Sequence, residues 1–150
     1  MTTKRKYLAN QATYEFWEDF SKLKKKGKGD YDSLSKELAE FLEHTPDEVF
    51  QKGEIIKRFS KDARIVKVRL KNRTLRKGTR GGYRVFVYVN LRTDQKILMI
   101  AYPKTGRLGI ENVSDSFVNE RTDQLTEAYS IDDLLDVVIE DGEVVDFIGL

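Results

Sequence analysis

Apolar residues recur at helical spacing in two segments near the start of the chain. The segments cover residues 12–27 and 31–46, and their apolar stripes are Phe16, Phe20, Leu23, Leu34, Leu38, Phe41 and Leu42. Residues three or four positions apart lie on one face of a helix, and glycine or proline commonly follows a helix end, as Gly27 and Pro46 do here. The pattern predicts two antiparallel helices joined by a short loop.

From Arg64 onward, apolar residues recur at every second position or in short β-forming runs. Residues 64–71, 81–90 and 96–102 show this pattern, and turn-forming residues separate them. A period of two is typical of a strand with one buried face, and successive strands of this kind pair in an antiparallel manner. The segments predict a three-stranded antiparallel meander, whereas residues 47–62 show no clear pattern.

The last forty residues predict a helix followed by an ambiguous segment. Residues 111–130 have a weak helical pattern. Ser130 and the acids after it resemble a helix N-cap, which favours a helix over about residues 131–140 that ends at Gly142 and is followed by a short strand. Asp141 and Gly142 also form a strong signal for a two-residue hairpin turn. The cap is the more specific signal, so we expect the helix, with the hairpin as the alternative.

These elements predict one α+β fold, since 150 residues suffice to bury a single core. Two N-terminal helices would pack on a small antiparallel β-meander, with a C-terminal helix and a short strand. Charge divides the chain, because all 27 Lys and Arg lie at or before Arg121 and nine of the 25 acids lie after it. We expect a basic domain over residues 1–122, with net charge +11, and an acidic appendage over residues 123–150, with net charge −9, packed on that domain.

Composition excludes several classes of protein. There is no cysteine, and no apolar run reaches the roughly 18 residues that cross a bilayer. The N-terminus lacks the apolar core of a signal peptide, and no Walker loop or Ser-His-Asp set is present. His44 lies at a predicted helix end, and the acids from Asp132 to Asp136 fit the first turn of a helix. We therefore expect a cytoplasmic protein with no membrane partner, no metal and no small-molecule cofactor.

Cations dominate the predicted strands. Between Arg64 and Arg107 there are thirteen Lys and Arg but a single acid, Asp94. Like charges on neighbouring strands destabilise a sheet, so a surface sheet normally mixes the two signs. The excess therefore indicates a polyanionic partner, and nucleic acid binds such patches through its phosphates.

The meander would gather these cations into one patch. Lys67, Arg69 and Lys71 share a face of the first strand, Arg84 enters the second strand, and Lys104 follows the third. Exposed tyrosines beside a cationic groove can stack on bases of single-stranded nucleic acid. The residues expected to bind RNA in this way are Lys71, Arg73, Lys77, Arg80, Tyr83, Tyr102 and Arg107.

Three segments of the chain resemble a known family. Residues 77–84, Lys-Gly-Thr-Arg-Gly-Gly-Tyr-Arg, are similar to the "GxGKSGGxR" segment before a core strand in a HigB-like subgroup of the RelE/ParE superfamily, the RelE-like toxins of bacterial type II toxin–antitoxin systems. Residues 102–104, Tyr-Pro-Lys, resemble the "(A/S)K" after the next strand. Residues 129–147 follow the closing pattern "LSDxELxxLLxxGELxEV". The resemblance covers about residues 13–148.

The resemblance implies a metal-independent endoribonuclease that cleaves mRNA on the ribosome and is neutralised by a cognate antitoxin protein. In such enzymes the 2′-hydroxyl attacks the adjacent phosphate, while basic side chains orient the phosphate, stabilise its charge and move protons. Lys67 and Arg69 match basic positions of the first strand. Arg84 matches the arginine that would contact the scissile phosphate, and Lys104 matches the cation after the third strand.

Two other functions fit the same patch. A ParE-like gyrase-binding toxin would keep the fold without needing Arg84 at a phosphate, and a regulator would bind nucleic acid without cutting it. The charge division also raises the hypothesis that residues 123–150 shield the basic domain.

Overall fold

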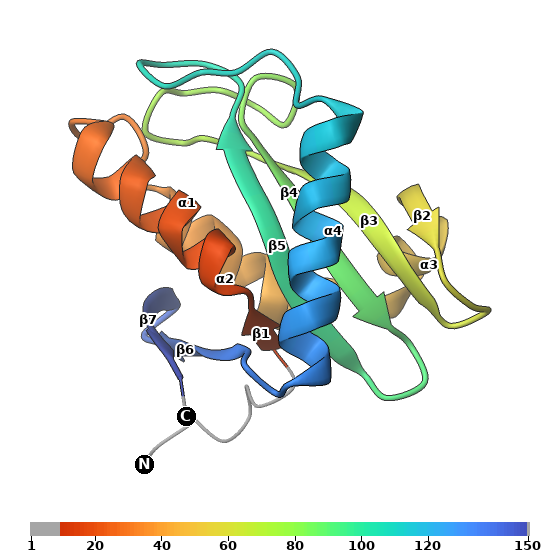
Figure 1. Ribbon diagram of the computed structural model, residues 1–150. Coiled ribbons are helices and arrows are strands. Elements are labelled where there is room, and N and C mark those ends of the chain that lie inside the picture. The colour runs from red at the N-terminus through yellow and green to blue at the C-terminus, as the bar shows by residue number, and fades with distance from the viewer. Residues whose placement is uncertain (1–9, 150) are drawn as a thin grey trace.

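The computed structural model describes residues 10–149 (Figure 1). They form β1 (Asn10–Ala12), α1 (Tyr14–Lys26), α2 (Leu34–His44), α3 (Asp47–Lys52), β2 (Glu54–Arg58), β3 (Ala63–Leu70), β4 (Tyr83–Asn90), β5 (Gln95–Pro103), α4 (Asp115–Ser130), β6 (Leu135–Glu140) and β7 (Glu143–Ile148). The predicted helices in residues 12–27, 31–46 and 111–130 are confirmed as α1, α2 and α4. None of the described helices is long and apolar enough to cross a membrane.

All seven strands belong to one mixed sheet, in the order β2-β3-β4-β5-β1-β6-β7. The predicted strands are confirmed as β3, β4 and β5, which pair in an antiparallel manner. β1 pairs in parallel with β5 and antiparallel with β6, so it joins the meander to the C-terminal hairpin. The sheet therefore holds both parallel and antiparallel pairs, over a larger area than the meander alone.

The predicted architecture, two N-terminal helices on a small antiparallel meander, is therefore wrong. A strand precedes α1, β2 extends the far edge, and β6 and β7 continue the sheet beyond β1. Three-residue β1 is too short to show a period of two, and a parallel pair cannot be read from local spacing. The predicted boundary at residue 122 falls within α4.

The C-terminal segment also differs from the expected helix. Residues 135–140 and 143–148 form the hairpin of β6 and β7, which was the alternative interpretation. Asp141 and Gly142 both have positive φ, 52° and 75°, as a type I′ turn requires. Ser130 is the last residue of α4, and its hydroxyl donates to the Glu127 carbonyl instead of capping a new helix.

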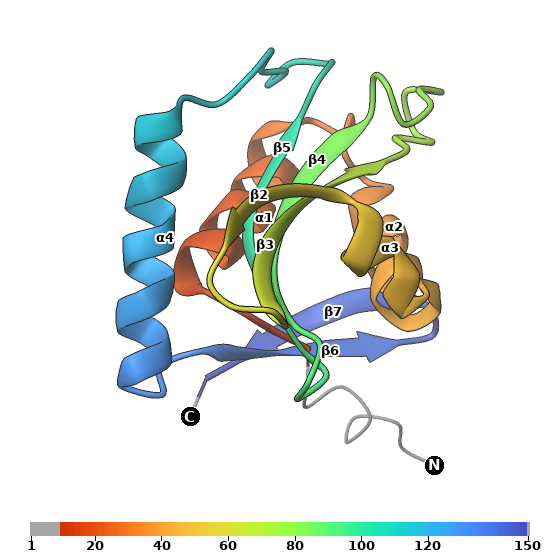
Figure 2. The ribbon, with the colours of Figure 1, turned by 90° about the vertical axis from the view of Figure 1, so that its right-hand side faces the viewer.

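Helices cover both faces of the central strands, as Figure 2 shows with α4 on one side and α2 on the other. The larger core lies under α1 and α2 and contains side chains such as Phe16, Leu38, Val87 and Leu98. The smaller core lies under α4 and contains Ile65, Phe86, Ile97, Met99, Ile100, Tyr102, Leu125 and Leu134. Alternate residues of β3 to β5 point to the two faces, which is why both cores form from the same strands.

A charged pair fixes α1 and α4 to the edge of β5 that β1 leaves open. The Arg121 guanidinium makes two hydrogen bonds to the Asp19 carboxylate, 2.7 and 3.0 Å long, and donates to the Met99 carbonyl. Asp19 also accepts the backbone N–H of Ala101. These side chains satisfy backbone groups of an open strand edge, and this fixes α4 over the smaller core.

Candidate nucleic-acid interface

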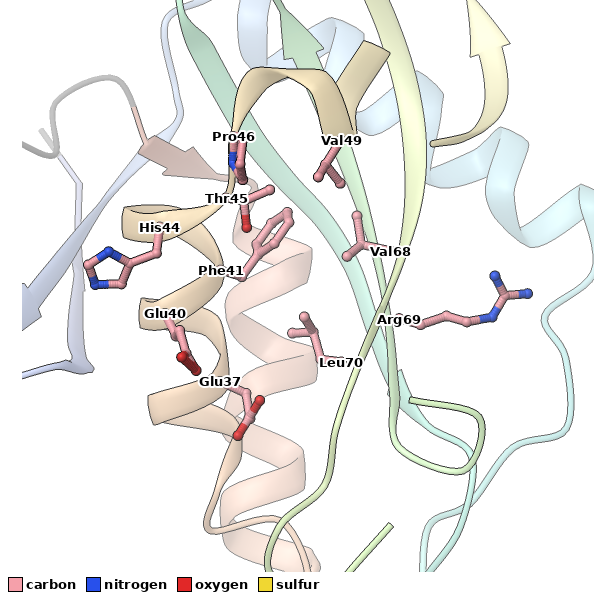
Figure 3. Close-up of a pocket in the computed structure, with 10 residues that line it drawn as sticks. All are labelled: Glu37, Glu40, Phe41, His44, Thr45, Pro46, Val49, Val68, Arg69 and Leu70. Carbon is pink, nitrogen blue, oxygen red and sulfur yellow. The ribbon is translucent and has the colours of Figure 1, made fainter. Parts of the chain in front are cut away.

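A row of polar side chains crosses β3, β4 and β5 on the face that α4 covers. Arg69 pairs with Arg84 across β3 and β4, and Arg84 pairs with Tyr102 across β4 and β5. Directly opposite residues of antiparallel strands have Cβ atoms about 5 Å apart, so the three side chains are immediate neighbours. Figure 3 shows Arg69 pointing away from Phe41 of α2, whereas Val68 and Leu70 point toward it. We call Arg69, Arg84 and Tyr102 the arginine row.

Arg84 is the buried centre of this row, with 5% of its surface exposed. Its guanidinium donates to the backbone carbonyls of Thr79, Arg80 and Tyr83 at 2.7, 2.7 and 3.1 Å. A guanidinium has five N–H donors, so two are left beyond these three bonds. Arg84 therefore holds the glycine-rich loop against the sheet and retains donors for a ligand.

Burial lowers the pKa of Arg84, and the neighbouring Arg69 cation lowers it further. Arginine remains protonated at neutral pH in proteins, so two positive charges lie side by side in this row. Like charges repel more strongly where water is partly excluded, so an anion beside this pair is favourable.

Tyr102 ends the row on β5 and is 3% exposed. Its hydroxyl has no hydrogen-bond partner among residues 10–149. Burial raises the pKa of Tyr102, partly offset by the positive charge of Arg84. Its hydroxyl is therefore neutral at pH 7 and can donate, and a buried hydroxyl without a partner costs about 1 to 3 kcal/mol.

Glu54 approaches the row from β2, and the sequence analysis did not identify it. It lies opposite Lys67 in the sheet, and its carboxylate makes a 3.3 Å ion pair with Arg69. The same carboxylate acts electrostatically on Arg84 and Tyr102, raising the pKa of both. Glu54 falls in residues 47–62, where no periodic pattern was visible. The sequence feature that could have predicted a strand here is the short β-forming run Glu-Ile-Ile, which Glu54 opens.

A groove of about 410 Å³ lies between the middle of β2 and α4. Lys67 and Phe86 contribute to its lining, and the Lys67 ammonium lies 5.8 Å from the centre of the Phe86 ring. The groove also contains Lys57 from β2 and Asp115 and Asn119 from α4. Phe86 itself is buried, so the groove offers the cations Lys57 and Lys67 to the phosphates of a polyanion and no exposed Phe86 ring to its bases.

Another hollow, of about 380 Å³, lies on the opposite side of β3 between α2 and α3 (Figure 3). Phe41, Val49 and Leu70 line it together with Glu37 and Glu40. Its carboxylates repel phosphate, so this hollow is a poorer candidate for nucleic acid than the α4 face.

Several predicted RNA-binding residues lie away from the arginine row. Arg73 makes a 2.6 Å ion pair with Glu37 of α2, and the backbone N–H of Arg107 donates to Asp30. Tyr83 is completely buried on the α1 and α2 side, where its hydroxyl bonds to Ser33. Its ring is therefore not accessible for stacking on a base.

The other predicted cations surround the row or lie in nearby loops. Lys104 follows Tyr102, and its ammonium binds the Glu111 carbonyl in the loop before α4. Lys71, Lys77 and Arg80 are exposed in the segment between β3 and β4. The backbone of Arg80 lies beside Arg84, since its carbonyl accepts from the Arg84 guanidinium. The exposed side chains of all three residues can contact an RNA backbone that passes the loop.

The loop glycines have different roles. A Cβ on Gly82 would lie 2.0 Å from the Leu70 carbonyl oxygen, so only glycine lets β4 start this close to the end of β3. A Cβ on Gly78 would meet nothing within 4 Å. Gly82 thus serves chain packing, which places Arg84 opposite Arg69.

Comparison of the chain with protein-family models, curated proteins and solved structures found no match. Within residues 10–149, no group of three His, Asp or Glu side chains is arranged to hold a metal ion.

Proposed function

We propose that the chain is a RelE-like toxin: an mRNA endoribonuclease that acts on the ribosome and is neutralised by a separate antitoxin protein. Its substrate would lie in the groove beside α4, with one phosphate on the arginine row. The proposal rests on the resemblance of residues 77–84, 102–104 and 129–147 and on the chemistry of this face.

The observation that carries the proposal is the placement of two arginines side by side on the central strands. Arg69 and Arg84 lie opposite each other in the register of β3 and β4, and burial of Arg84 makes its charge costly without an anion. Rigid strands place both cations before the substrate arrives, which is what electrostatic stabilisation of a charged transition state requires.

Lys67 lies two residues before Arg69 on the same face of β3, and its side chain lines the groove. In the proposed function it holds a neighbouring phosphate of the mRNA and fixes the direction in which the strand lies. Lys104 has a more distant role, because its ammonium is bound to the Glu111 carbonyl and positions the loop before α4.

One observation favours a second candidate, a nucleic-acid-binding regulator that does not cut. Three donors of Arg84 are bound to the carbonyls of Thr79, Arg80 and Tyr83. These bonds hold the loop against the sheet, and a module that only binds nucleic acid would need the same support. Such a module would use the same face, and Arg84 would then support the loop instead of a reaction.

The test is induced expression in a bacterial host, with growth and new 5′ ends on a translated reporter mRNA as measurements. The variants are Arg69→Ala, Arg84→Ala and, as a matched control, Arg92→Ala in the exposed turn between β4 and β5. Wild type and the control should arrest growth and cut at codon-phased positions. Removing a preorganised cation should reduce cutting about 100- to 1000-fold.

Arg69→Ala is the decisive variant, because Arg84→Ala also removes hydrogen bonds that support the loop. Arrest without cuts in wild type would contradict the nuclease and favour the gyrase-binding alternative. Absence of both arrest and cuts, with RNA binding intact, would favour the regulator.

A further inference from the structure

We propose that Glu54 is the general base of the reaction and Tyr102 its general acid, on either side of the two arginines. This inference rests on the proposed function. It assigns proton transfer to a carboxylate and a phenol that face the arginine row, whereas the sequence pattern pointed to basic side chains alone.

The strand order places the two groups on opposite sides of the arginines. Tyr102 lies directly opposite Arg84, whereas Glu54 lies opposite Lys67 and reaches Arg69 through its ion pair. Glu54 comes from β2 and Tyr102 from β5, with Arg69 on β3 and Arg84 on β4 between them. Neighbouring strands are about 4.8 Å apart, so the backbones of β2 and β5 are separated by about 14 Å. The side chains reach inward over this span. A phosphate held by the arginines would have one group on each side, as an in-line displacement requires.

Glu54 has the properties of a base in this position. Its side chain is 45% exposed, so a 2′-hydroxyl entering from the groove can approach it. The 3.3 Å ion pair with Arg69 orients the carboxylate. Among the described residues, it is the one carboxylate that acts electrostatically on both Arg84 and Tyr102.

Tyr102 has the properties of an acid. Its hydroxyl is neutral, buried and without a partner among the described residues, so a ligand oxygen would be its first hydrogen-bond acceptor. The phenolate that remains after proton donation would be stabilised by Arg84, the charge that already favours it in the free protein.

Protons and electrons balance in the proposed reaction. The 2′-hydroxyl gives its proton to the Glu54 carboxylate as its oxygen bonds to phosphorus. The bond from phosphorus to the 5′-oxygen breaks, and that oxygen keeps the electron pair and takes the proton of Tyr102. The products are a 2′,3′-cyclic phosphate and a 5′-hydroxyl end. Protonated Glu54 then returns a proton to the Tyr102 phenolate through solvent, and both groups are restored.

The test uses the full chain with purified ribosomes on a defined mRNA, under single-turnover conditions from pH 5 to 8. The variants are Glu54→Gln and Tyr102→Phe, with Glu40→Gln on α2 and Tyr129→Phe on α4 as exposed controls. A parallel measurement follows binding of a short 2′-O-methyl RNA, which cannot be cleaved, by fluorescence anisotropy.

We expect Glu54→Gln to cut at least about 100 times more slowly and to bind the 2′-O-methyl RNA as tightly as wild type or more tightly. Tyr102→Phe should lose about 10-fold or more of the rate, and both controls should behave like wild type.

Two outcomes would overturn the assignment. If Glu54→Gln binds more tightly and also cuts at least as fast as wild type, Glu54 is only the ion-pair partner of Arg69. If Tyr102→Phe keeps the full rate, the phenol is not the acid. Each leaves the nuclease proposal intact, whereas failure of the wild-type protein to cut at all would contradict the proposed function itself.

Discussion

The two faces of the central sheet use the same strands in different ways. On the face under α1 and α2, residues such as Val66, Val85 and Val87 are apolar and completely buried, and Tyr83 has a hydrogen-bond partner in Ser33. On the face under α4, an apolar core continues from Ile65 to Phe86 and then gives way to charge. The arginine row occupies the last strand pairs, with two like charges and an unpartnered hydroxyl.

This difference underlies the proposal that the face under α4 serves binding, whereas the face under α1 and α2 serves stability. Glu54 offsets part of this charge through its ion pair with Arg69, while the buried Tyr102 hydroxyl has no partner among residues 10–149, so a phosphate ligand would stabilise this face. The apolar face needs none. Comparing substitutions between the two faces therefore tests the account.

The largest effect is expected in the apolar face. Leu98→Ala removes a completely buried side chain from the larger core and should lower the free energy of unfolding by about 3 kcal/mol. Arg69→Ala, on the other face, should change it by less than about 0.5 kcal/mol, since Arg69 is half-exposed. Urea denaturation followed by circular dichroism measures both, and equal losses would contradict the division between the faces.

Alkaline pH should weaken the apolar face through Tyr83. Burial raises the pKa of Tyr83 to about 12, above the ordinary value of 10.0. The unfolded chain loses this proton first, so stability is complete below pH 10 and falls as pH rises toward 12. The loss attributable to Tyr83 should reach about 2 to 3 kcal/mol across that window.

Urea denaturation of wild type and Tyr83→Phe at pH 8, 10 and 11 separates this contribution from the other tyrosines. The variant should lose less stability than wild type over the same range. Identical pH dependence of the free energy of unfolding in the two proteins would contradict the raised pKa of Tyr83, because its hydroxyl would then ionise as easily in the folded protein as in the unfolded chain.

The pair that joins the two faces should have a somewhat smaller effect. Arg121→Met keeps a long side chain but removes both hydrogen bonds from the guanidinium to the Asp19 carboxylate. Of the described hydrogen bonds to Asp19, the one from the backbone N–H of Ala101 then remains. We expect the free energy of unfolding, measured by thermal or urea denaturation, to fall by about 2 kcal/mol. This is less than for a fully buried ion pair, because both side chains are partly exposed. Lys22→Met on the exposed face of α1 is the control, and a loss of equal size there would argue against a specific role for the pair.

The smallest and most diagnostic contrast is between two tyrosines. Tyr83→Phe removes a hydroxyl that bonds to Ser33 and should destabilise the protein by about 1 kcal/mol. Tyr102→Phe removes a buried hydroxyl without a partner and should be neutral or slightly stabilising. If both variants lose the same stability, Tyr102 is satisfied in solution and the two faces do not differ as described.

Much of the fold was visible in local spacing. The stripe of Phe16, Phe20 and Leu23 and the alternation of Val66, Val68 and Leu70 predicted α1 and β3, because each pattern reports which face is buried. The overall topology was not predictable in this way. β1 has three residues, and its parallel pairing with β5 depends on a contact between segments more than eighty residues apart.

The site was only partly predictable for a related reason. Alternation along β3 put Lys67 and Arg69 on one face, but it could not show that Arg73 pairs with Glu37 or that Tyr83 points into the larger core. Glu54 lies in a short edge strand, and its ion pair with Arg69 depends on the pairing of this strand with β3, which places Glu54 opposite Lys67. Charge composition can be counted in the sequence, whereas the pairing of the strands decides which charges meet.

The most direct test of the central claim is NMR titration of the arginine side-chain N–H signals with a short 2′-O-methyl RNA. The account predicts saturable shifts of the Arg69 and Arg84 Nε–H signals, and little change at Arg121, which is bound to Asp19. Shifts spread evenly over all arginines, or an unchanged pair at Arg69 and Arg84, would contradict a phosphate site on the arginine row.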